Sequence, residues 1–191
     1  MVGLAAAGAV DEETLAFAAS SLASALGVVT TLVGPFPEPS YAYDGSRGQH
    51  SSTLILLDAV ARRPAAAARL LVLTEHDLFI PMLSFVFGQA QVDGPVAVMS
   101  LARLRQEFYG LRSNRTLLLH RVRKEALHEI AHTYGLTHCS DPSCTLSLST
   151  DIRQLDRKNG DFCASCAILV REAVAAVHDS LRGSYRRGGV R

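Results

Sequence analysis

Three histidines lie within a short stretch of the chain, at spacings that suit a metal site. His128 and His132 are four positions apart, so on a helix their imidazoles lie one turn apart on the same face and can bind one ion. We expect Gly135 to end that helix in a left-handed conformation, so that the chain can turn and bring in His138 as a third ligand. Three histidine nitrogens leave one position of a zinc tetrahedron open, which is typical of a catalytic site.

Glu129 lies beside the first of these histidines and is not needed as a ligand. A zinc ion in such a site lowers the pKa of its bound water to about 7 and polarises a carbonyl oxygen. We expect Glu129 to take the proton of that water and deliver it to the leaving amine. The alternative is a chance occurrence of the pattern in a charged helix, which the offsets of Gly135 and His138 disfavour.

The four cysteines of the chain follow directly after His138. They form two closely spaced pairs, Cys139 with Cys144 and Cys163 with Cys166, which is the pattern of a closed zinc site with four thiolate ligands. A redox pair is one alternative, but it is expected near a β-α-β start without a second pair close by. Two disulfides are the other, and they need an oxidising compartment, for which we see no secretion signal. Because His138 and Cys139 are adjacent, the two metals are expected within about 14 Å of each other.

The complete motif resembles that of the archaemetzincins, compact metzincin-type zinc metalloproteases. It reads HExxHxxGxxH, followed at once by a cysteine, by another after four residues, and by a distant CxxC pair. The resemblance extends upstream to residues 74–79 (TEHDLF), 85–88 (FVFG) and 100–110 (SLARLRQEFYG), so it covers nearly the whole chain. It implies that the three histidines hold a catalytic zinc, that Glu129 is the general acid and base, and that the four cysteines hold a second, structural zinc.

Leu146 departs from the family pattern, which has the methionine of the turn beneath the zinc at this position. Leucine and methionine have similar volumes, and such replacements usually cost less than about 1.5 kcal/mol. The segment between Leu146 and Cys163 is also interpreted as one residue shorter than in the family. We expect metal binding to persist and the fine positioning of the site to change.

Length and composition fit one folded domain over residues 1–191, with a flexible tail from about 184. The chain has 191 residues, is 48% hydrophobic and carries a formal net charge of +1. This composition can supply a core, and the near-neutral charge argues against a nucleic-acid partner. The basic residues between Arg112 and Lys124 are interpreted as a solvated face. The apolar N-terminus lacks a basic start and meets three acidic residues at 11–13, so we expect a cytoplasmic monomer without a membrane partner.

Hydrophobic periodicity, capping residues and turn residues predict the elements of the first half of the chain. The opening is a β-α-β unit with a parallel strand pair. It comprises a short first strand, a helix over 12–26 between Asp11 and Gly27, and a buried strand over 28–33. The elements that follow are a surface loop over 34–48, a helix that Ser51 or Ser52 caps and that ends before Pro64, and a central strand over 69–74.

Two more strands, 85–92 and 95–101, are expected to pair as a hairpin across Asp93-Gly94. By the resemblance, the first of them is the antiparallel edge strand above the cleft. An extended peptide can add to such an edge, which makes four residues candidates for substrate binding. These are Phe85, Val86, Phe87 and Gly88. An edge without a ligand is the alternative.

Two upstream residues are weaker candidates for the site. His76 is a possible additional ligand, although a turn residue bonded to backbone is the favoured interpretation. Tyr109 can donate a hydrogen bond to an oxyanion if it reaches the zinc, and simple packing is the alternative. Two helices are expected downstream, over about 116–134 and 163–181, and His178 on the second of them is interpreted as a surface residue.

Together these features predict an α/β (mixed α+β) domain with a metzincin-like fold. It has a twisted mixed sheet with an antiparallel edge strand, an active-site helix and a C-terminal helix. The expected function is zinc-dependent hydrolysis of peptide bonds in a peptide or protein substrate, as a protease or an aminopeptidase. The main alternative is a zinc-stabilised peptide-binding protein with little or no turnover, which Leu146 and the small size of the domain favour. A nucleic-acid-binding protein built on the cysteines is disfavoured by the charge.

Overall fold

The computed structural model describes residues 1–187, and its centre is a mixed five-stranded sheet with the order β2-β1-β5-β8-β7. The strands, in that order, are β2 (Thr30–Leu32), β1 (Val2–Ala7), β5 (Arg69–Thr74), β8 (Val96–Ser100) and β7 (Gly88–Ala90). Strand β7 runs antiparallel to β8 at one edge, and the other neighbours are parallel. The predicted mixed sheet with an antiparallel edge strand is confirmed.

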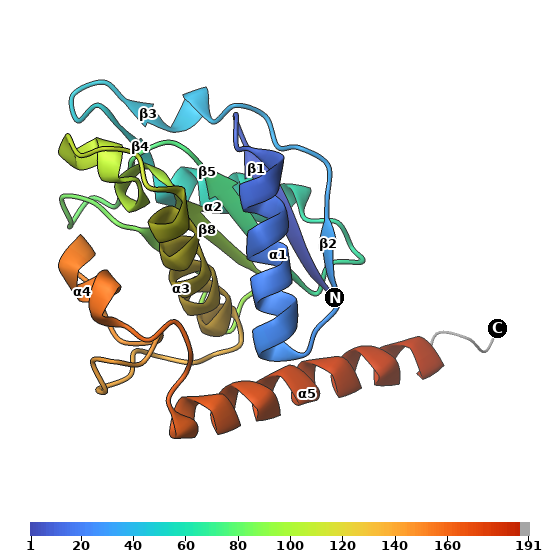
Figure 1. Cartoon of the computed structure of the whole chain (residues 1–191). Helices are drawn as coiled ribbons and strands as arrows, with labels where there is room; N and C mark the ends of the chain where they lie inside the picture. The colour runs from blue at the N-terminus through green and yellow to red at the C-terminus, as the bar shows by residue number, and fades with distance from the viewer. Residues whose placement is uncertain (188–191) are drawn as a thin grey trace.

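Helices cover both faces of this sheet (Figure 1). On one face lie α1 (Glu12–Leu26) and α3 (Arg115–Thr133), and on the other lies α2 (Ser52–Arg62). In Figure 1, α5 (Ala164–Arg187) crosses below the ends of α1 and α3, and its apolar residues join the same core as theirs. Successive side chains of β5 point to opposite faces, so Leu71 and Leu73 join the first core while Leu70 and Val72 join the second. A strand with both faces covered is continuously apolar, which explains the sequence of β5.

Local capping fixes the helix ends that the sequence predicted. The Asp11 carboxylate accepts a hydrogen bond from the Thr14 amide at 2.8 Å, and Gly27 ends α1 with a φ of 64°. Ser51 caps α2. Asn114 caps α3 by accepting from the Leu117 amide at 3.0 Å.

The predicted buried strand over 28–33 is wrong in its extent and burial. Strand β2 is short and forms the outer edge of the sheet, where it pairs with β1. Val29 and Leu32 are therefore 69% and 48% exposed. β-branched residues favour a strand in general, but they do not determine whether that strand lies at the centre or the edge.

Several short elements were not predicted. The expected surface loop over 34–48 contains the turn η1 (Ser40–Ala42) and β3 (Tyr43–Asp44), which joins β4 (Gln49–Ser51) and β6 (Leu78–Phe79) in a second sheet. The other additions are η2 (Ala102–Leu104), η3 (Gln106–Tyr109) and α4 (Ile152–Arg157). Residues 184–187, expected as a flexible tail, continue α5, while 188–191 lie outside the described residues. Among the described helices, none combines the length and apolar character that a bilayer crossing requires.

Candidate metal centres

The three histidines of the motif converge. His128 and His132 lie on the last turns of α3, and Gly135, with a φ of 88°, turns the chain so that His138 approaches from the following loop. Their ligand nitrogens all lie within 4.8 Å of one another. The Nε2 atoms of His128 and His132 are 3.1 Å apart, close to the ligand separation of about 3.3 Å that a zinc tetrahedron requires. The geometry fits a single zinc ion.

The outward ring nitrogens of two of these histidines contact backbone carbonyls. Nδ1 of His128 lies 3.0 Å from the Thr145 oxygen, and Nδ1 of His132 lies 2.7 Å from the Leu136 oxygen. Because a carbonyl only accepts, each Nδ1 must carry the proton, which leaves the Nε2 lone pairs free for a metal. Burial lowers the pKa of His128, His132 and His138, which favours the neutral rings that metal ligation requires.

Glu129 is buried beside these rings at 4% exposure. Its Oε2 has no hydrogen-bond partner among the described residues. Burial raises the pKa of Glu129 well above its usual value, and the charge of Glu125 one turn earlier adds to the effect. Burial raises the pKa of Glu125 as well. An unpartnered carboxyl oxygen of raised pKa is suited to accept and return a proton.

Gly88 leaves room for the side chain of Glu129. A Cβ at position 88 would lie 2.5 Å from Oε1 of Glu129 and 2.6 Å from its Cδ and Cγ. The backbone of β7 therefore passes directly against this carboxylate, and only glycine permits the approach. This is a different contribution from the substrate contact that the sequence predicted for Gly88.

Lys158 adds a buried cation that the sequence analysis missed. It is 3% exposed, and its Nζ donates to the Thr145 carbonyl at 3.0 Å, the same oxygen that His128 contacts. Burial lowers the pKa of Lys158, while the nearby Glu125 and Glu129 oppose that shift. The spacing of Glu125 and Glu129 on one helical face was a signal for the acidic pair. No sequence pattern marked Lys158, which reaches the site from the loop after α4.

A cavity of about 380 Å³ opens in front of these groups. Its walls include His128, His132, His138, Glu125, Glu129, Lys158, Phe85, Val86, Phe87, Gly88, Leu148 and Thr150. The structure thus brings the predicted segment 85–88 to the histidines. The predicted strand over 85–92 is wrong in length, because β7 begins at Gly88 and the Val86 amide instead donates to Leu78 at 2.9 Å.

Tyr109 and His76 do not join this cavity. The Tyr109 hydroxyl donates to the Arg103 carbonyl at 3.0 Å, and the residue is absent from the cavity wall. The structure therefore does not bring Tyr109 to the histidines, because its place in η3 directs it toward Arg103 and Phe108. His76 stacks on His50 in a separate cluster.

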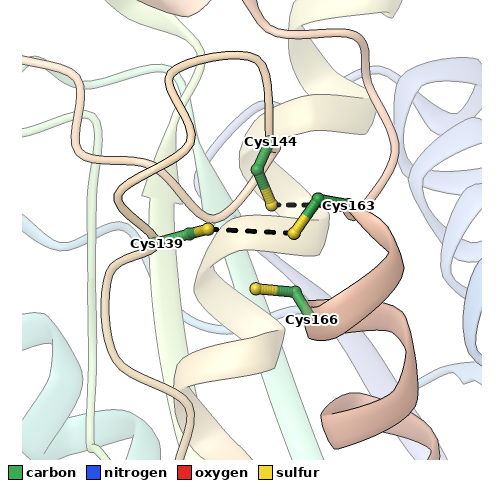
Figure 2. Close-up of side chains that lie close together, drawn as sticks. All are labelled: Cys139, Cys144, Cys163 and Cys166. Atoms are coloured by element: carbon green, nitrogen blue, oxygen red, sulfur yellow. Dashed lines mark hydrogen bonds between the residues drawn. The ribbon is translucent and has the colours of Figure 1, made fainter.

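The four cysteines also converge (Figure 2). Their sulfurs lie within 4.8 Å of one another, and those of Cys139 and Cys163 are 3.8 Å apart. Zinc–sulfur bonds of about 2.3 Å in a tetrahedron give the same separation of about 3.8 Å. All four cysteines are free, and Figure 2 shows their sulfurs facing a common centre from the loop and from the start of α5. The donor set and its spacing fit a closed zinc site.

The loop that carries Cys139 and Cys144 also contacts the histidine cluster. The Cys163 amide donates to the Cys144 sulfur at 3.3 Å, which opposes the rise in the Cys144 pKa that burial causes. The Cys139 amide donates to the carbonyl of Leu146 at 3.0 Å. Thr145, between Cys144 and Leu146, supplies the carbonyl that His128 contacts. Leu146 is 1% exposed and belongs to the main core, so leucine fills this position without leaving it open to solvent.

Two basic residues of α3 are buried, so the predicted solvated face is wrong at these positions. Arg121 and Lys124 are 4% and 9% exposed. Arg121 forms two hydrogen bonds of 2.7 Å to the Asp156 carboxylate, and Lys124 donates to the Leu155 and Asp156 carbonyls. These contacts hold α4, which the sequence did not predict, against the helix that carries the histidines.

Several known proteins with similar sequences or structures are described as archaemetzincins or zinc-dependent peptidases. Residues 64–172 match the family described as Peptidase family M54. An archaemetzincin of Methanocaldococcus jannaschii is 42% identical over 159 residues, which cover 83% of this chain and 86% of that protein. The crystal structure of an archaemetzincin from Methanopyrus kandleri superposes with a TM-score of 0.80 at 33% identity, covering 91% of this chain and 94% of that one.

A structure described as a zinc-dependent peptidase, from Methanocorpusculum labreanum, is also similar. It has a TM-score of 0.78 at 28% identity and covers 89% of this chain and 100% of that one. The family match spans more than half of the chain, and the curated relative covers most of it. The chain therefore belongs to peptidase family M54, the archaemetzincin family of zinc metallopeptidases.

Proposed function

We propose that this protein hydrolyses peptide bonds in peptide or protein substrates, with zinc at the histidine cluster. The observation that carries the proposal is the convergence of three neutral imidazoles on one point beside a buried carboxylate. We assign His128, His132 and His138 to the catalytic zinc, and the four cysteines to a second, structural zinc. When bound, the catalytic zinc polarises the substrate carbonyl and acidifies a water molecule.

Glu129 is proposed as the general base and then the general acid. Its Oε2 is unpartnered among the described residues, and Glu129 forms part of the cavity wall, so it can receive a proton from a water held there. The raised pKa lets the carboxyl group hold that proton and return it to the leaving amine. Glu125 and Lys158 are proposed to position Glu129, because both also contribute to that wall, and the Lys158 cation is proposed to balance its charge.

We propose that the substrate lies along β7. One side of this strand pairs with β8, and its other side is the edge of the sheet, where main-chain groups are available to an extended peptide. Phe85, Val86 and Phe87 lead into the strand and form part of the cavity wall. Their apolar side chains exclude water from the site, which strengthens electrostatic interactions within it. The four free thiols fit a protein of a reducing compartment such as the cytoplasm.

The test compares the zinc-loaded protein with Glu129→Gln on a peptide library, with cleavage followed by mass spectrometry. We expect the variant to keep its zinc, measured by elemental analysis, and to lose on the order of 10²–10⁴-fold in turnover. Glu172→Gln, at an exposed position of α5, is the matched control and should cleave at the unchanged rate. Equal rates for Glu129→Gln and the unaltered protein would reject Glu129 as the base. Library peptides bound but never cleaved by the unaltered protein would favour a peptide-binding function instead.

A further inference from the structure

A third group of metal-ligand side chains lies apart from both clusters described above. It consists of Glu38, His50 and His76, whose ligand atoms lie within 4.8 Å of one another. The His50 and His76 rings stack with centroids 4.0 Å apart and an interplanar angle of 26°. Nε2 of His76 contacts Oε1 of Glu38. None of the three residues contributes to the cavity wall of the histidine site.

The group lies where the order of the sheet reverses. From β1 the chain passes through α1 to β2 on one side, and it later returns through α2 to β5 on the other side of β1. These two helices lie on opposite faces. In open α/β sheets, ligands bind outside the carboxyl ends of the strands at such a reversal. Glu75 and His76 directly follow β5, and Gly8 directly follows β1.

Gly8 shows how closely the chain approaches this point. Its φ is 79°, and any side chain there would collide with the Glu38 carboxylate. Phe36, two residues before Glu38, bridges to Ala7 at the end of β1, which brings Glu38 to the carboxyl end of that strand. The glycine therefore leaves room for the carboxylate beside His76.

The backbone of each ligand is held without help from an ion. The His50 amide donates to the Asp77 carbonyl at 2.8 Å, within the second sheet. The His76 carbonyl accepts from the Ser100 hydroxyl at 2.6 Å. Glu38 lies between two prolines, at 37 and 39, which restrict its backbone. Such a preorganised group loses little conformational entropy when it binds a ligand.

We propose that Glu38, His50 and His76 form a third metal site, which takes a divalent transition ion such as Zn²⁺. Two imidazoles and one carboxylate suit zinc and its neighbours in the first row, rather than calcium or magnesium. Zinc bound at 2.0–2.2 Å needs ligand atoms about 3.3 Å apart, and the ligand atoms here already lie within 4.8 Å of one another, so binding requires them to close by at most about 1.5 Å. Solvent reaches Glu38 and His76, so water completes the coordination.

The competing arrangement is a hydrogen-bonded Glu38–His76 pair with His50 stacked on it and no ion. The two arrangements differ in the amount of metal bound. The proposal is independent of the peptidase activity, because it involves no residue of the histidine cavity or of the cysteine cluster.

The test measures zinc per chain by elemental analysis, on full-length protein equilibrated with low-micromolar free Zn²⁺. His76→Ala should contain one zinc fewer than the unaltered protein, and Glu38→Gln, which keeps a hydrogen-bonding side chain but removes the charge, should show the same loss. His120→Ala, at an exposed position of α3, is the matched control and should retain the full zinc content. The difference between proteins is the readout, so it holds whatever the occupancy of the other two sites.

Peptide cleavage by both variants should proceed at the unaltered rate, which separates this proposal from the function of the histidine site. If His76→Ala and Glu38→Gln each contain as much zinc as the unaltered protein, the third site does not exist and the hydrogen-bonded pair is correct. Should His76→Ala fail to fold, Glu38→Gln carries the same test, because its side chain is 54% exposed.

Discussion

The histidine cluster and the cysteine cluster differ in the number of ligands that the chain can supply to an ion. The cysteine cluster offers four sulfurs from two segments, with backbone amides donating to Cys139 and Cys144. The histidine cluster offers three nitrogens, one of them on the exposed His138, and faces a cavity. The wall of that cavity contains a carboxyl oxygen with no partner in the part of the chain that the structure describes. A filled coordination sphere contributes to folding, whereas an open one leaves room for a reactant.

The two clusters are close in sequence, and one loop contacts both of them. The loop that begins at Cys139 returns through Cys144 to Thr145, whose carbonyl contacts both His128 and Lys158. The cysteine cluster therefore fixes a carbonyl that orients a histidine ring, and partners of this kind are worth about 10- to 100-fold in metal affinity. Replacing a cysteine should therefore also weaken zinc binding by the histidines, whereas replacing Glu129 should affect the histidine site alone.

Removing one cysteine is expected to have the largest effect. Cys163→Ser should lower the free energy of unfolding by on the order of 4 kcal/mol, because a structural zinc contributes directly to folding. It should also weaken zinc at the histidine cluster. Thermal unfolding and elemental analysis measure both effects, with Ser140→Ala at an exposed position as the control. An unchanged melting temperature with full zinc content would count against the structural site.

A side chain at Gly88 tests the open site without touching a ligand. Gly88→Ala should displace the Glu129 carboxylate, because the new Cβ would lie 2.5 Å from Oε1. A misplacement of about 1 Å costs on the order of 100-fold in turnover. Gly34→Ala, where a Cβ meets nothing within 4 Å, is the control. Matching cleavage rates for these two variants would show that the contact does not position the base.

Lys158→Met should weaken the histidine site and leave the cysteine site intact. The change removes the donor to the Thr145 carbonyl and the cation near Glu125 and Glu129, while methionine keeps much of the buried volume. We expect about a 10-fold loss of zinc affinity at one site only, measured by competition with a chelator. Arg153→Met, at an exposed position of α4, serves as the control. Equal loss at both sites would mean that Lys158 supports the fold in general.

Replacing Asp11 is expected to have the smallest effect and to leave the zinc content unchanged. Burial alone would raise its pKa, but hydrogen bonds from Arg115 and Thr14 outweigh burial and lower it to about 2, from 3.8. A folded-state pKa below the unfolded one stabilises the fold above about pH 4, and this stabilisation is lost as the pH falls toward 2.

Asp11→Asn keeps the helix cap and removes the charge, so it should cost about 0.5–1 kcal/mol at pH 6. That difference should vanish near pH 2, as measured by urea unfolding. A difference that does not change with pH would contradict the assignment, and loss of zinc in this variant would show that the region is coupled to the metal centres.

The features that the sequence predicted well are local. The bounds of α1 follow from Asp11 and Gly27, those of α2 from Ser51 and Pro64, and the end of α3 from Gly135. The histidines and the cysteines that converge in the structure were each predicted as a group, because the spacing of metal ligands is restricted within one helix and one loop.

The features that the sequence did not predict depend on contacts between distant segments. Lys158 enters the site only because Arg121 and Lys124 of α3 hold α4 nearby. The role of Gly88 depends on the closeness of β7 to α3, and a glycine in a strand pattern does not identify the side chain that uses its space. Tyr109 was assigned to the site from its type alone, and the packing of η3 directs it elsewhere.

The central claim is that three histidines share one ion that faces the cavity, while the cysteines enclose another. Anomalous diffraction at the zinc absorption edge, from crystals of zinc-loaded protein, tests it most directly. We predict one peak about 2.1 Å from the Nε2 atoms of His128, His132 and His138, and a second about 2.3 Å from the four sulfurs. Histidine rings that share no peak in fully loaded crystals would contradict the account.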